Sequence, residues 1–408
     1  MTAAEKVLSR IEAVQDWLED VYVRLHENPE LSSEEVETAR YVTDLLSSWG
    51  YDVQHVGGGV VGVLANGEGP TVLGRADMDG LPVVEATGLP YASTRTTTDA
   101  TGGTVGVMHA CGHDVHVTAG LGAARLLAEA RDAWSGTYVA LFQPAEETAA
   151  GARAMVADGL VDRVPRPDVA FAQHVLTSPA AGELATAPGA VLSAGDSIRI
   201  TVFGTGSHGS MPHLGVDPVV IAASIVMRLQ TVVAREIAPS AFGVVTVGSV
   251  QAGSKSNIIP DRAVLLVNVR TYDLAVRETI LGAIERIVRG ECAASGSPQE
   301  PTFEFYDQYP LTANDTGVVD TVTQAFRRHF GEERVRPMEP APASEDFSIV
   351  PDAFGIPYCY WGLGGFLPGT PVYPNHNPKF APAMEPTLRT GAEALVVAAL
   401  SYLATIDS

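Results

Sequence analysis

One stretch of the chain carries most of the information about its fold and chemistry: Met108-His109-Ala110-Cys111-Gly112-His113-Asp114-Val115-His116. It places a thiol, three imidazoles and a carboxylate within nine residues, at the end of a glycine-rich loop. Thiolate, imidazole and carboxylate are groups that bind Zn²⁺ in proteins. Cys111 and His113 are two residues apart, so in an extended backbone both side chains point to the same side. The stretch favours a metal site; the alternative is a buried cysteine among surface histidines.

Reactive side chains also follow three predicted strands, each just beyond the C-terminal end of its strand. The strands and these side chains are Thr71–Arg75 with Asp77 and Asp79, Thr137–Gln143 with Glu146 and Glu147, and Asp168–Gln173 with His174. In open α/β sheets, ligands bind in the crevice outside the carboxyl ends of the strands. We therefore expect Asp77, the two glutamates and His174 to meet the Cys111 loop at one edge of a sheet.

Each of these side chains also has a purely structural explanation. Asp77 and Asp79 could be turn residues, because aspartate is common in turns. Glu146 and Glu147 could begin a helix, where carboxylates interact favourably with the helix dipole. His174 could be a hydrogen-bonded core histidine. All of these explanations would have to hold together at one sheet edge, so we favour the metal site.

The order of predicted strands and helices indicates an α/β protein with a second domain inserted into it. Strands and helices alternate up to about residue 193, which predicts a mostly parallel central sheet. Residues 194–308 show the order β-α-β-β-α-β of a ferredoxin-like α+β sandwich, and the α/β pattern resumes over 309–408. We expect a catalytic domain formed by 1–193 and 309–408, with an inserted domain of ordinary size. Near the N-terminus, Ser32-Ser33-Glu34-Glu35 fits a capping box and predicts a helix that begins near Ser32.

Length, charge and cysteine usage exclude several classes of protein. A chain of 408 residues is too long for one ordinary core. Its 26 basic and 48 acidic residues give a net charge of −22, which excludes a general nucleic-acid binder and means that an anionic substrate needs a local cation. The 3 cysteines are widely spaced, which argues against a disulfide framework. No uninterrupted apolar run reaches the length of a membrane span, so we expect a cytoplasmic protein without membrane partners.

The predicted ligand set is larger than one catalytic metal needs. A catalytic zinc has about three protein ligands and keeps one position open, whereas this set holds a cysteine, two or more histidines and two glutamates. Two metal ions roughly 3.5–4 Å apart, bridged by a thiolate and a water, would use the set better. One of the adjacent glutamates would then bind metal, and the other would act as a general base on the attacking water.

Seven blocks of sequence, taken in order, carry a resemblance to a known family. The blocks are Gly74–Pro82, Met108–His116, Gln143–Glu147, Gly206–Gly209, Asn257–Pro260, Ser344–Phe347 and Asn375–Phe380. They resemble the dinuclear-zinc amidohydrolases that include hippurate hydrolases, auxin-conjugate hydrolases and N-acyl-amino-acid aminoacylases, with glutamate-releasing carboxypeptidases as more distant relatives. The resemblance implies a zinc-exopeptidase-like catalytic domain, an inserted lid and dimerisation domain, and a homodimer or higher homo-oligomer.

Position by position, the resemblance implies the metal ligands and the general base. The implied ligands are Cys111, His113, Glu147, His174 and His376, with Cys111 as the bridging ligand. Glu146 would be the general base, and Asp77 would orient a ligand imidazole. The cofactor would be two divalent metal ions per subunit, zinc by preference, with manganese or cobalt as alternatives.

The inserted domain contributes three further residues by the same resemblance. His208 would stabilise the tetrahedral oxyanion, in some relatives from the partner subunit; the alternative is a loop histidine. Asn257 and Arg270 would face the substrate. A guanidinium binds a carboxylate in bidentate fashion, so Arg270 would supply the local cation that an acidic chain needs; the alternative is a surface arginine.

The expected activity is hydrolysis of the amide bond of N-acyl or N-aroyl L-amino acids to a carboxylic acid and a free amino acid. The run Ala170–His174 looks most like bacterial aminoacylases of the N-acyl-glutamine type. Thr148 stands where relatives often have glycine, which leaves the acyl group open. The alternatives are a dipeptidase or carboxypeptidase with the same dinuclear site, and a non-catalytic metal-binding homologue.

Overall fold

The computed structural model describes residues 2–98 and 102–405 of the chain, which forms two compact units. Unit 1 consists of Met1–Val191, Ala313–Glu339 and Asp346–Ser408, and unit 2 consists of Leu192–Thr312 and Pro340–Glu345. Unit 1 is built on a mixed sheet with helices, and unit 2 on a separate antiparallel sheet.

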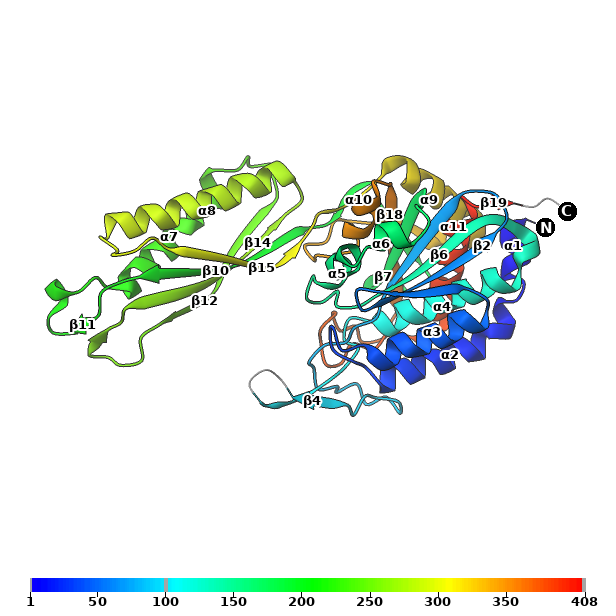
Figure 1. Ribbon diagram of the computed structural model, residues 1–408, viewed down its shortest axis with the longest axis horizontal. Coiled ribbons are helices and arrows are strands. Elements are labelled where there is room, and N and C mark those ends of the chain that lie inside the picture. The colour runs from blue at the N-terminus through cyan, green and yellow to red at the C-terminus, as the bar shows by residue number, and fades with distance from the viewer. Residues whose placement is uncertain (1, 99–101, 406–408) are drawn as a thin grey trace. The chain divides into compact units, whose positions relative to one another are not determined.

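A nine-stranded sheet forms the centre of unit 1, with the order β1-β2-β6-β3-β7-β18-β8-β17 and with β19 paired to β6 (Figure 1). Its strands are β1 (Asp52–Val56), β2 (Gly59–Asn66), β3 (Thr71–Asp77), β6 (Trp134–Gln143), β7 (Val169–Ala180), β8 (Leu184–Thr186), β17 (Val335–Pro337), β18 (Tyr358–Phe366) and β19 (Ala404–Thr405). The central strands β6, β3, β7 and β18 run parallel and are mostly buried. Their nearly continuous apolar runs suit strands that are covered on both faces. The predicted α/β class with a mostly parallel centre is confirmed.

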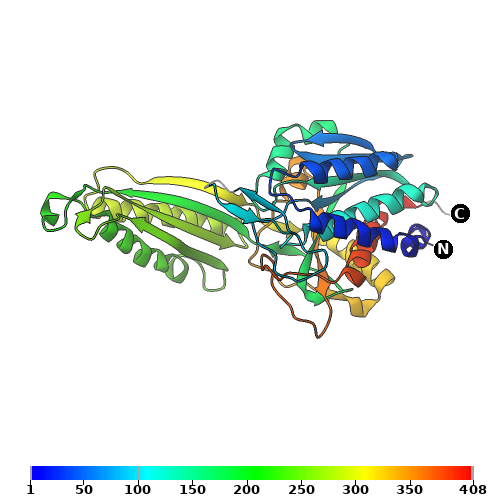
Figure 2. The same cartoon turned by 90° about the horizontal axis from the view of Figure 1, so that it is seen from below.

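Helices cover this sheet, and one of the N-terminal helices packs on the helices that contact its central strands. The longer helices are α2 (Ile11–Glu27), α3 (Val36–Ser48), α4 (His113–Glu129), α9 (Thr316–Phe330) and α11 (Met384–Leu400); the short ones are α1 (Ala3–Leu8), α5 (Gly151–Ala157), α6 (Leu160–Arg163) and α10 (Ile349–Phe354). α4 packs on β3, β6 and β7, and α11 packs on α4, β7 and β18. α2 packs on both α4 and α11, so the sheet lies under two layers of helix; Figure 2 shows the N-terminal helices in blue. The short strands β4 (Thr96–Thr98), β5 (Thr104–Gly106), β9 (Gly189–Leu192) and β16 (Thr312–Asn314) pair outside the main sheet.

The predicted capping box at Ser32 is wrong. α3 begins at Val36, and its N-cap residue, Glu35, makes no side-chain cap. Ser33 has a positive φ of 68°, which prevents the helix from starting earlier. The hydroxyl of Ser32 donates to Asp79 Oδ2 at 2.7 Å instead. The segment before α3 therefore forms a tertiary contact, through Ser32 and Asp79, with the residues that follow β3.

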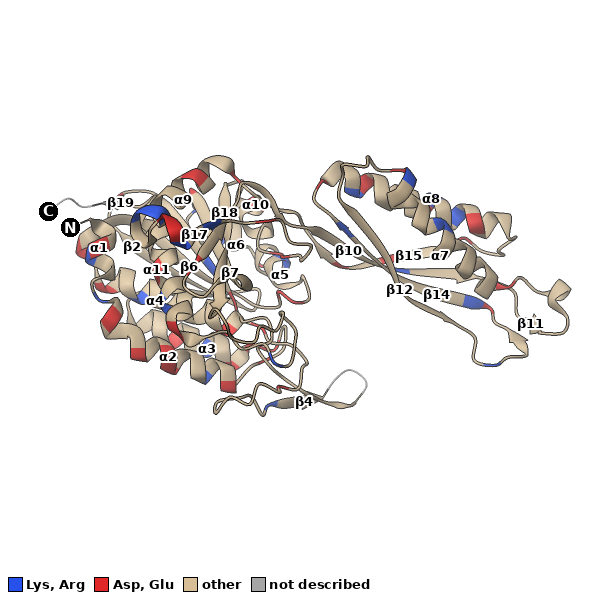
Figure 3. Cartoon of the chain, turned by 180° about the vertical axis from the view of Figure 1, so that it is seen from behind, with Lys and Arg blue, Asp and Glu red and all other residues tan. Residues whose placement is uncertain are grey.

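Acidic side chains gather on α2 in unit 1 (Figure 3). Its sequence, IEAVQDWLEDVYVRLHE, holds five carboxylates and one arginine, and all five carboxylates are exposed or half-buried. Most apolar positions of the same helix are buried. The acidic excess here lies on the solvent side of an amphipathic helix, as expected for side chains that are excluded from a core.

A buried ion triad joins α2 to the start of α4. His26 Nδ1 lies 2.6 Å from Asp114 Oδ2, and His26 Nε2 lies 3.1 Å from Glu85 Oε1, with all three side chains almost fully buried. Burial alone would lower the pKa of His26, but the hydrogen bonds to Asp114 and Glu85 raise it to about 10. The imidazolium therefore ties the N-terminal helix to the helix that carries His113.

We expect His26→Leu to lower the free energy of unfolding by about 3–5 kcal/mol at pH 7, because removing one partner leaves uncompensated buried charge. Urea unfolding measures this, and exposed His55 in β1 offers a control, His55→Leu, which should stay within about 0.5 kcal/mol of wild type. Since the folded pKa of His26 is raised from 6.5 to about 10, its stabilisation is complete below pH 6.5 and is lost as the pH rises through about 10. A His26→Leu protein as stable as wild type at pH 7 would contradict the prediction.

Unit 2 is a four-stranded antiparallel sheet, in the order β12-β14-β10-β15, with two helices on one face (Figure 1). Its main elements are β10 (Ala194–Phe203), α7 (Pro218–Arg235), β12 (Gly243–Ala252), β14 (Arg262–Thr271), α8 (Leu274–Ala294) and β15 (Thr302–Tyr309), and the short strands are β11 (Ser207–His208) and β13 (Ile258–Ile259). Buried and half-exposed residues alternate along β14, as in a sheet with one covered face. This chain order and strand order confirm the predicted ferredoxin-like sandwich.

Helix α7 is long and apolar enough, by length and composition, to cross a membrane, although the sequence analysis predicts no such run. The expectation was based on uninterrupted apolar runs, and Arg228 interrupts the apolar run of this helix. Its buried residues recur at helical spacing, and five of them pack in the core of unit 2: Ile221, Ala222, Ile225, Leu229 and Val232. The arrangement is that of a core helix that covers a sheet.

Candidate metal centre

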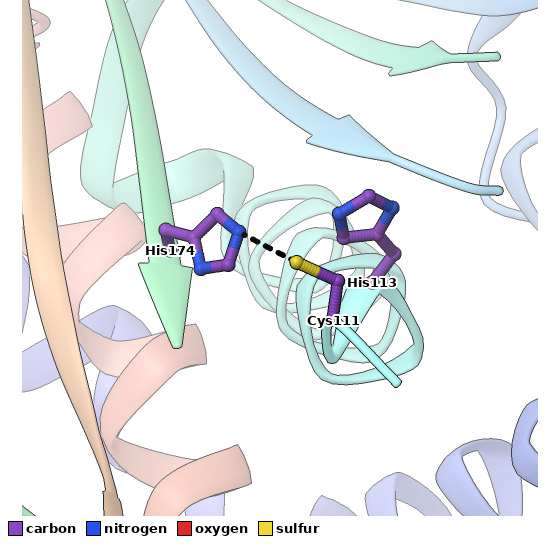
Figure 4. Close-up of side chains that lie close together, drawn as sticks. All are labelled: Cys111, His113 and His174. Atoms are coloured by element: carbon purple, nitrogen blue, oxygen red, sulfur yellow. Dashed lines mark hydrogen bonds between the residues drawn. The ribbon is translucent and has the colours of Figure 1, made fainter. Parts of the chain in front are cut away.

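Gly112 sets the geometry of the Cys111–His113 loop. It precedes α4 in the left-handed conformation, with φ 82°, and a Cβ at this position would lie 2.3 Å from Val175 Cγ1. Only glycine therefore fits here. The turn makes His113 the first residue of α4 and leaves Cys111 just before the helix. Figure 4 shows both side chains at this helix start, with His174 reaching from β7 toward the thiol.

Two overlapping groups of three side chains share the Cys111 thiol. In the first group, the ligand atoms of Cys111, His113 and His174 lie within 4.8 Å of one another, with Cys111 Sγ 3.5 Å from His174 Nε2. In the second, Cys111 is joined by Glu147 and His376 within the same limit, with His376 Nε2 3.4 Å from Glu147 Oε2. Glu147 Oε1 also lies 3.8 Å from His113 Nε2. The structure thus brings all five expected ligands together around one thiol.

Hydrogen bonds at Nδ1 orient the imidazoles of His113 and His174 so that Nε2 of each ring points into this cluster. His113 Nδ1 donates to Asp79 Oδ1 at 3.1 Å, and His174 Nδ1 donates to the carbonyl of Val175 at 2.9 Å. Within residues 2–98 and 102–405, His113 Nε2 and Glu147 Oε1 are buried without a hydrogen-bond partner. Burying unpaired polar atoms is unfavourable. Because both atoms belong to the groups around the thiol, this donor set fits a divalent cation such as zinc.

Burial and neighbouring charges set the protonation of the ligands. Burial, with the nearby His116, holds the pKa of His174 well below its ordinary value, which leaves the neutral imidazole that binds metals. Burial and the charge of Glu147 raise the pKa of the Cys111 thiol. Hydrogen bonds to Cys111 and Glu147 raise the pKa of His376 to about 10. Since a cation would displace protons from both groups, its affinity should increase with pH.

Asp77 is held between a buried cation and a second histidine. Arg75 Nη1 donates to Asp77 Oδ2 at 2.7 Å, and His116 Nδ1 donates to Asp77 Oδ1 at 2.5 Å. Asp77 Oδ2 also lies 3.6 Å from His113 Nε2. Burial would raise the pKa of Asp77, but Arg75 and His113 hold it well below its usual range. Asp77 is therefore an ionised carboxylate that borders the ligand cluster and orients His116 by a hydrogen bond.

Asp79 and His116 support the ligands; sequence reasoning named Asp79 only as a strand-end carboxylate and left His116 as a structural or ligand-supporting histidine. Asp79, and not Asp77, accepts the hydrogen bond from His113 Nδ1, and His116 Nε2 accepts the N–H of Val175 beside His174. Both residues had a detectable signal. Asp79 follows Asp77 at the two-residue spacing that places side chains on one side of an extended chain, and His116 follows His113 at the spacing of one helix face.

Glu146 is buried beside the ligand cluster on the turn that follows β6. Its carboxylate lies within 4.8 Å of ligand atoms of His113 and Glu147. The turn contains two alanines with left-handed backbone, Ala145 with φ 48° and Ala149 with φ 53°. Such strained backbone concentrates at functional sites. The turn thus presents two adjacent carboxylates to one cluster, as a metal ligand with a neighbouring general base requires.

Unit 2 brings His208 close to Asn257 and separates both from Arg270. His208 in β11 pairs with Ile258 of β13, and Gly209 N–H donates to the carbonyl of Asn257 at 2.8 Å. His208 and Asn257 are both exposed. Arg270 is near the opposite end of β14, where it donates to Asn268 and to the hydroxyl of Ser344. Burial lowers the pKa of Arg270, but the guanidinium stays charged at neutral pH.

Comparisons with known proteins agree with this fold. The sequence model of peptidase family M20/M25/M40 matches residues 73–401. The chain is 35% identical over 409 residues to thermostable carboxypeptidase 2 of Saccharolobus solfataricus, which covers 98% of this chain and 99% of that protein. It is 36% identical over 351 residues to hippurate hydrolase of Campylobacter jejuni, over 85% of this chain and 88% of that protein.

A solved structure has the same fold. It is the YXEP protein of Bacillus subtilis, described as a dinuclear metal binding peptidase from the M20 family. The TM-score is 0.77 at 29% sequence identity, and the match covers 95% of this chain and 98% of that one.

Proposed function

The chain belongs to peptidase family M20/M25/M40, and on that premise we propose that it is a metal-dependent amidohydrolase that cleaves N-acyl and N-aroyl L-amino acids to a carboxylic acid and a free amino acid. The observation that carries the proposal is the shared thiol. Cys111 belongs to two groups of three ligand atoms, and the buried carboxylate of Glu146 adjoins them. The similarity to a hippurate hydrolase supports the same class of bond.

In the proposed reaction, the chain's own residues move the protons and hold the substrate. Two divalent cations bound around Cys111 would polarise the amide carbonyl and lower the pKa of the attacking water. Glu146 takes a proton from that water and passes it to the leaving nitrogen. His208 Nδ1 accepts from Ser210 N–H at 3.1 Å, so its hydrogen sits on Nε2, from which it can be donated to the oxyanion. Arg270 binds the substrate with its remaining N–H groups on the substrate carboxylate, and Asn257, which lies beside His208, contacts the substrate on which His208 acts.

Zinc is the cation that we propose for the site. The five expected ligands combine a thiolate, imidazoles and one carboxylate, and zinc accepts all three types. A thiolate favours softer cations over magnesium or calcium, while manganese and cobalt remain alternatives that metal availability decides.

Hydrolysis of a small substrate panel tests the proposed function against its peptidase rival. The rival has support because the chain is 35% identical to a carboxypeptidase over nearly its whole length. The panel consists of hippurate, N-acetyl-L-glutamine, N-decanoyl-L-glutamine and an unblocked dipeptide, with metal content assayed on the same sample. We expect cleavage of blocked substrates that is lost on chelation and restored by Zn²⁺. Cleavage of the dipeptide alone would move the protein to the peptidase rival. With two metals bound, no cleavage of any panel member would contradict the substrate class and favour a non-catalytic homologue.

We further propose that unit 2 is the inserted lid and dimerisation domain, and that it pairs with a second copy through β12 and α7. β12 is an edge strand with exposed Val250, and α7 beside it exposes Val220 and Met227. Unpaired strand edges and exposed apolar stripes favour association. The separation of His208 from Arg270 along β14 supports His208 acting on the partner's substrate. Eight residues of strand span roughly 26 Å, which is too far for both to hold one small molecule.

We expect Met227→Glu to convert a dimer into monomers, because it places a charge in an apolar interface. Sedimentation at micromolar concentration measures the mass. Val84→Glu in unit 1 is the matched control, since Val84 and Met227 are 71% and 72% exposed. If His208 acts in trans, the monomer should also lose turnover while it keeps its metal. A wild-type protein that sediments as a monomer would exclude the pairing.

For the compartment, we propose the cytoplasm. Cys111, Cys292 and Cys359 are all free and buried. A reducing environment keeps such thiols available, and a bridging thiolate requires one of them.

A further inference from the structure

The turn that carries Glu146 has a backbone that ordinary residues avoid. Ala145 and Ala149, on either side of the two glutamates, have φ of 48° and 53°. For an alanine the left-handed region is unfavourable because Cβ crowds the backbone. The surrounding structure must therefore hold the turn in place.

Two carboxylates hold the backbone on either side of Glu146. Ala145 N–H donates to Glu35 Oε1 at 2.7 Å, and Glu147 N–H donates to Asp79 Oδ2 at 3.0 Å. Glu146 is the residue between these two fixed amides. Hydrogen bonds from N–H groups to carboxylates are among the stronger ones in proteins. The pair therefore fixes the direction in which the Glu146 side chain leaves the turn.

Both carboxylates depend on the segment before α3. Glu35 belongs to it, and Ser32 in the same segment donates its hydroxyl to Asp79 Oδ2 at 2.7 Å. The segment is anchored in turn, because Gly80 N–H donates to the carbonyl of Glu30 at 2.7 Å. The N-terminal segment therefore braces the turn at two points.

Glu35 is buried, and its loss would leave the rear of the turn without a protein acceptor. Its side chain helps to line a cavity of about 460 Å³ whose wall also includes Pro144, Ala145 and Gly151. Shortening this side chain would enlarge the cavity, and no neighbouring side chain would fill the space that the carboxylate leaves. Glu35 does not belong to any of the groups of candidate ligands, so it influences the site through its contact with the amide of Ala145.

We infer that Glu35 is a positioning residue for the general base: it accepts the amide of Ala145 and so keeps the strained turn in the conformation that aims Glu146 at the substrate. The inference rests on the proposed role of Glu146. Burial raises the pKa of Glu35 to about 7, and either protonation state leaves an oxygen that accepts this amide. Glutamine offers the same acceptor, so Glu35→Gln is the conservative variant.

The test compares Glu35→Ala, Glu35→Gln and the double variant Glu35→Ala/Ala145→Gly in the full-length, zinc-loaded protein. Glu34→Ala is the matched control, since Glu34 is the exposed neighbour in the same segment. The readouts are kcat and KM on the substrate that the panel identifies, zinc content, and amide hydrogen exchange of a peptide that covers Gln143–Glu147.

We expect Glu35→Ala to lower kcat by about 10²-fold, the effect of a misplaced catalytic group, with KM within about threefold and zinc content unchanged. Exchange of the Ala145 amide should become faster. Glu35→Gln should recover most of kcat. The double variant should recover part of it, because glycine adopts the left-handed conformation without support.

Three results would overturn the inference. One is wild-type kcat in Glu35→Ala. Another is an equal loss of kcat in Glu35→Ala and Glu35→Gln, which would mean that turnover depends on the charge of the carboxylate and not on its role as a hydrogen-bond acceptor. The third is unchanged amide exchange at Ala145. Failure of the proposed function can be told apart from failure of this inference. If the wild-type protein cleaves no panel substrate, the proposed function fails, and the amide exchange measurement still decides whether Glu35 holds the turn.

Discussion

We expect Glu146→Gln to lower kcat by about 10²–10⁴-fold while the protein keeps its metal and its affinity for substrate, because general acid–base catalysis contributes a factor of this size. Glutamine has nearly the same shape as glutamate, so the turn can keep its conformation. It cannot take a proton from water at neutral pH. The buried carboxylate of Glu146 lies within 4.8 Å of candidate ligand atoms, yet Glu147 is the one of the two that joins Cys111 and His376.

The comparison that isolates this role is Glu147→Gln. Both substitutions remove one carboxylate from the same turn, but only Glu147 belongs to the group around the thiol. We expect Glu147→Gln to lose metal, with activity partly restored by excess Zn²⁺, and Glu146→Gln to keep metal without restoration. The assignments would be reversed if Glu146→Gln lost metal and Glu147→Gln kept it. Single-turnover kinetics with hippurate and metal analysis of the dialysed variants measure both effects.

The sequence was sufficient for the sheet and for the gathering of ligands at its edge. Strand ends are marked by local pattern, and in a parallel sheet the carboxyl ends lie on the same side. Glu147 follows β6, whereas His174 lies within β7, which continues to Ala180 and so beyond the strand end expected at Gln173. β6 and β7 flank β3 in the sheet, so the strand order brings both residues toward Cys111. His376 could not be placed this way, because it lies in a loop with a positive φ of 69° that follows no such pattern.

The partners of the supporting side chains could not be predicted, because these contacts join residues that are distant in sequence. Asp79 meets His113 and Ser32, and Glu35 meets Ala145, which is 110 residues away. Local pattern misassigned this segment: Ser32 and Glu35 fit a capping box, yet both side chains are used in tertiary hydrogen bonds. A polar side chain near a helix start satisfies either role equally well, and only the fold decides between them.

Arg270 shows a related limit. The family resemblance implied that Arg270 faces the substrate, and in unit 2 its guanidinium already donates to Asn268 and Ser344. Arginine has five N–H donors, so these bonds orient the group and leave others for a carboxylate. The sequence could not show that Arg270 and His208 lie toward opposite ends of β14. Because of this separation, the roles that we propose for the two residues depend on the oligomeric state.

We expect Cys111→Ala to abolish tight binding at both metal positions at once. Changing a residue that merely supports a metal ligand lowers affinity by about 10–100-fold, so removal of a ligand shared by two ions should exceed that range. Cys111 is the common member of both groups of ligand atoms.

A carboxylate at the same position separates the bridging role from simple loss of volume. We expect Cys111→Asp to keep about two metals per chain, since an aspartate can also bridge two cations and zinc accepts oxygen ligands. Cys292→Ala is the control, because Cys292 is buried in unit 2 and should leave metal content unchanged. Titration with Zn²⁺ against a competing chelator measures the stoichiometry and both affinities. If Cys111→Ala retained one tightly bound ion, the thiol would be a ligand to a single metal, and the two groups of donor atoms would have to be assigned to independent sites.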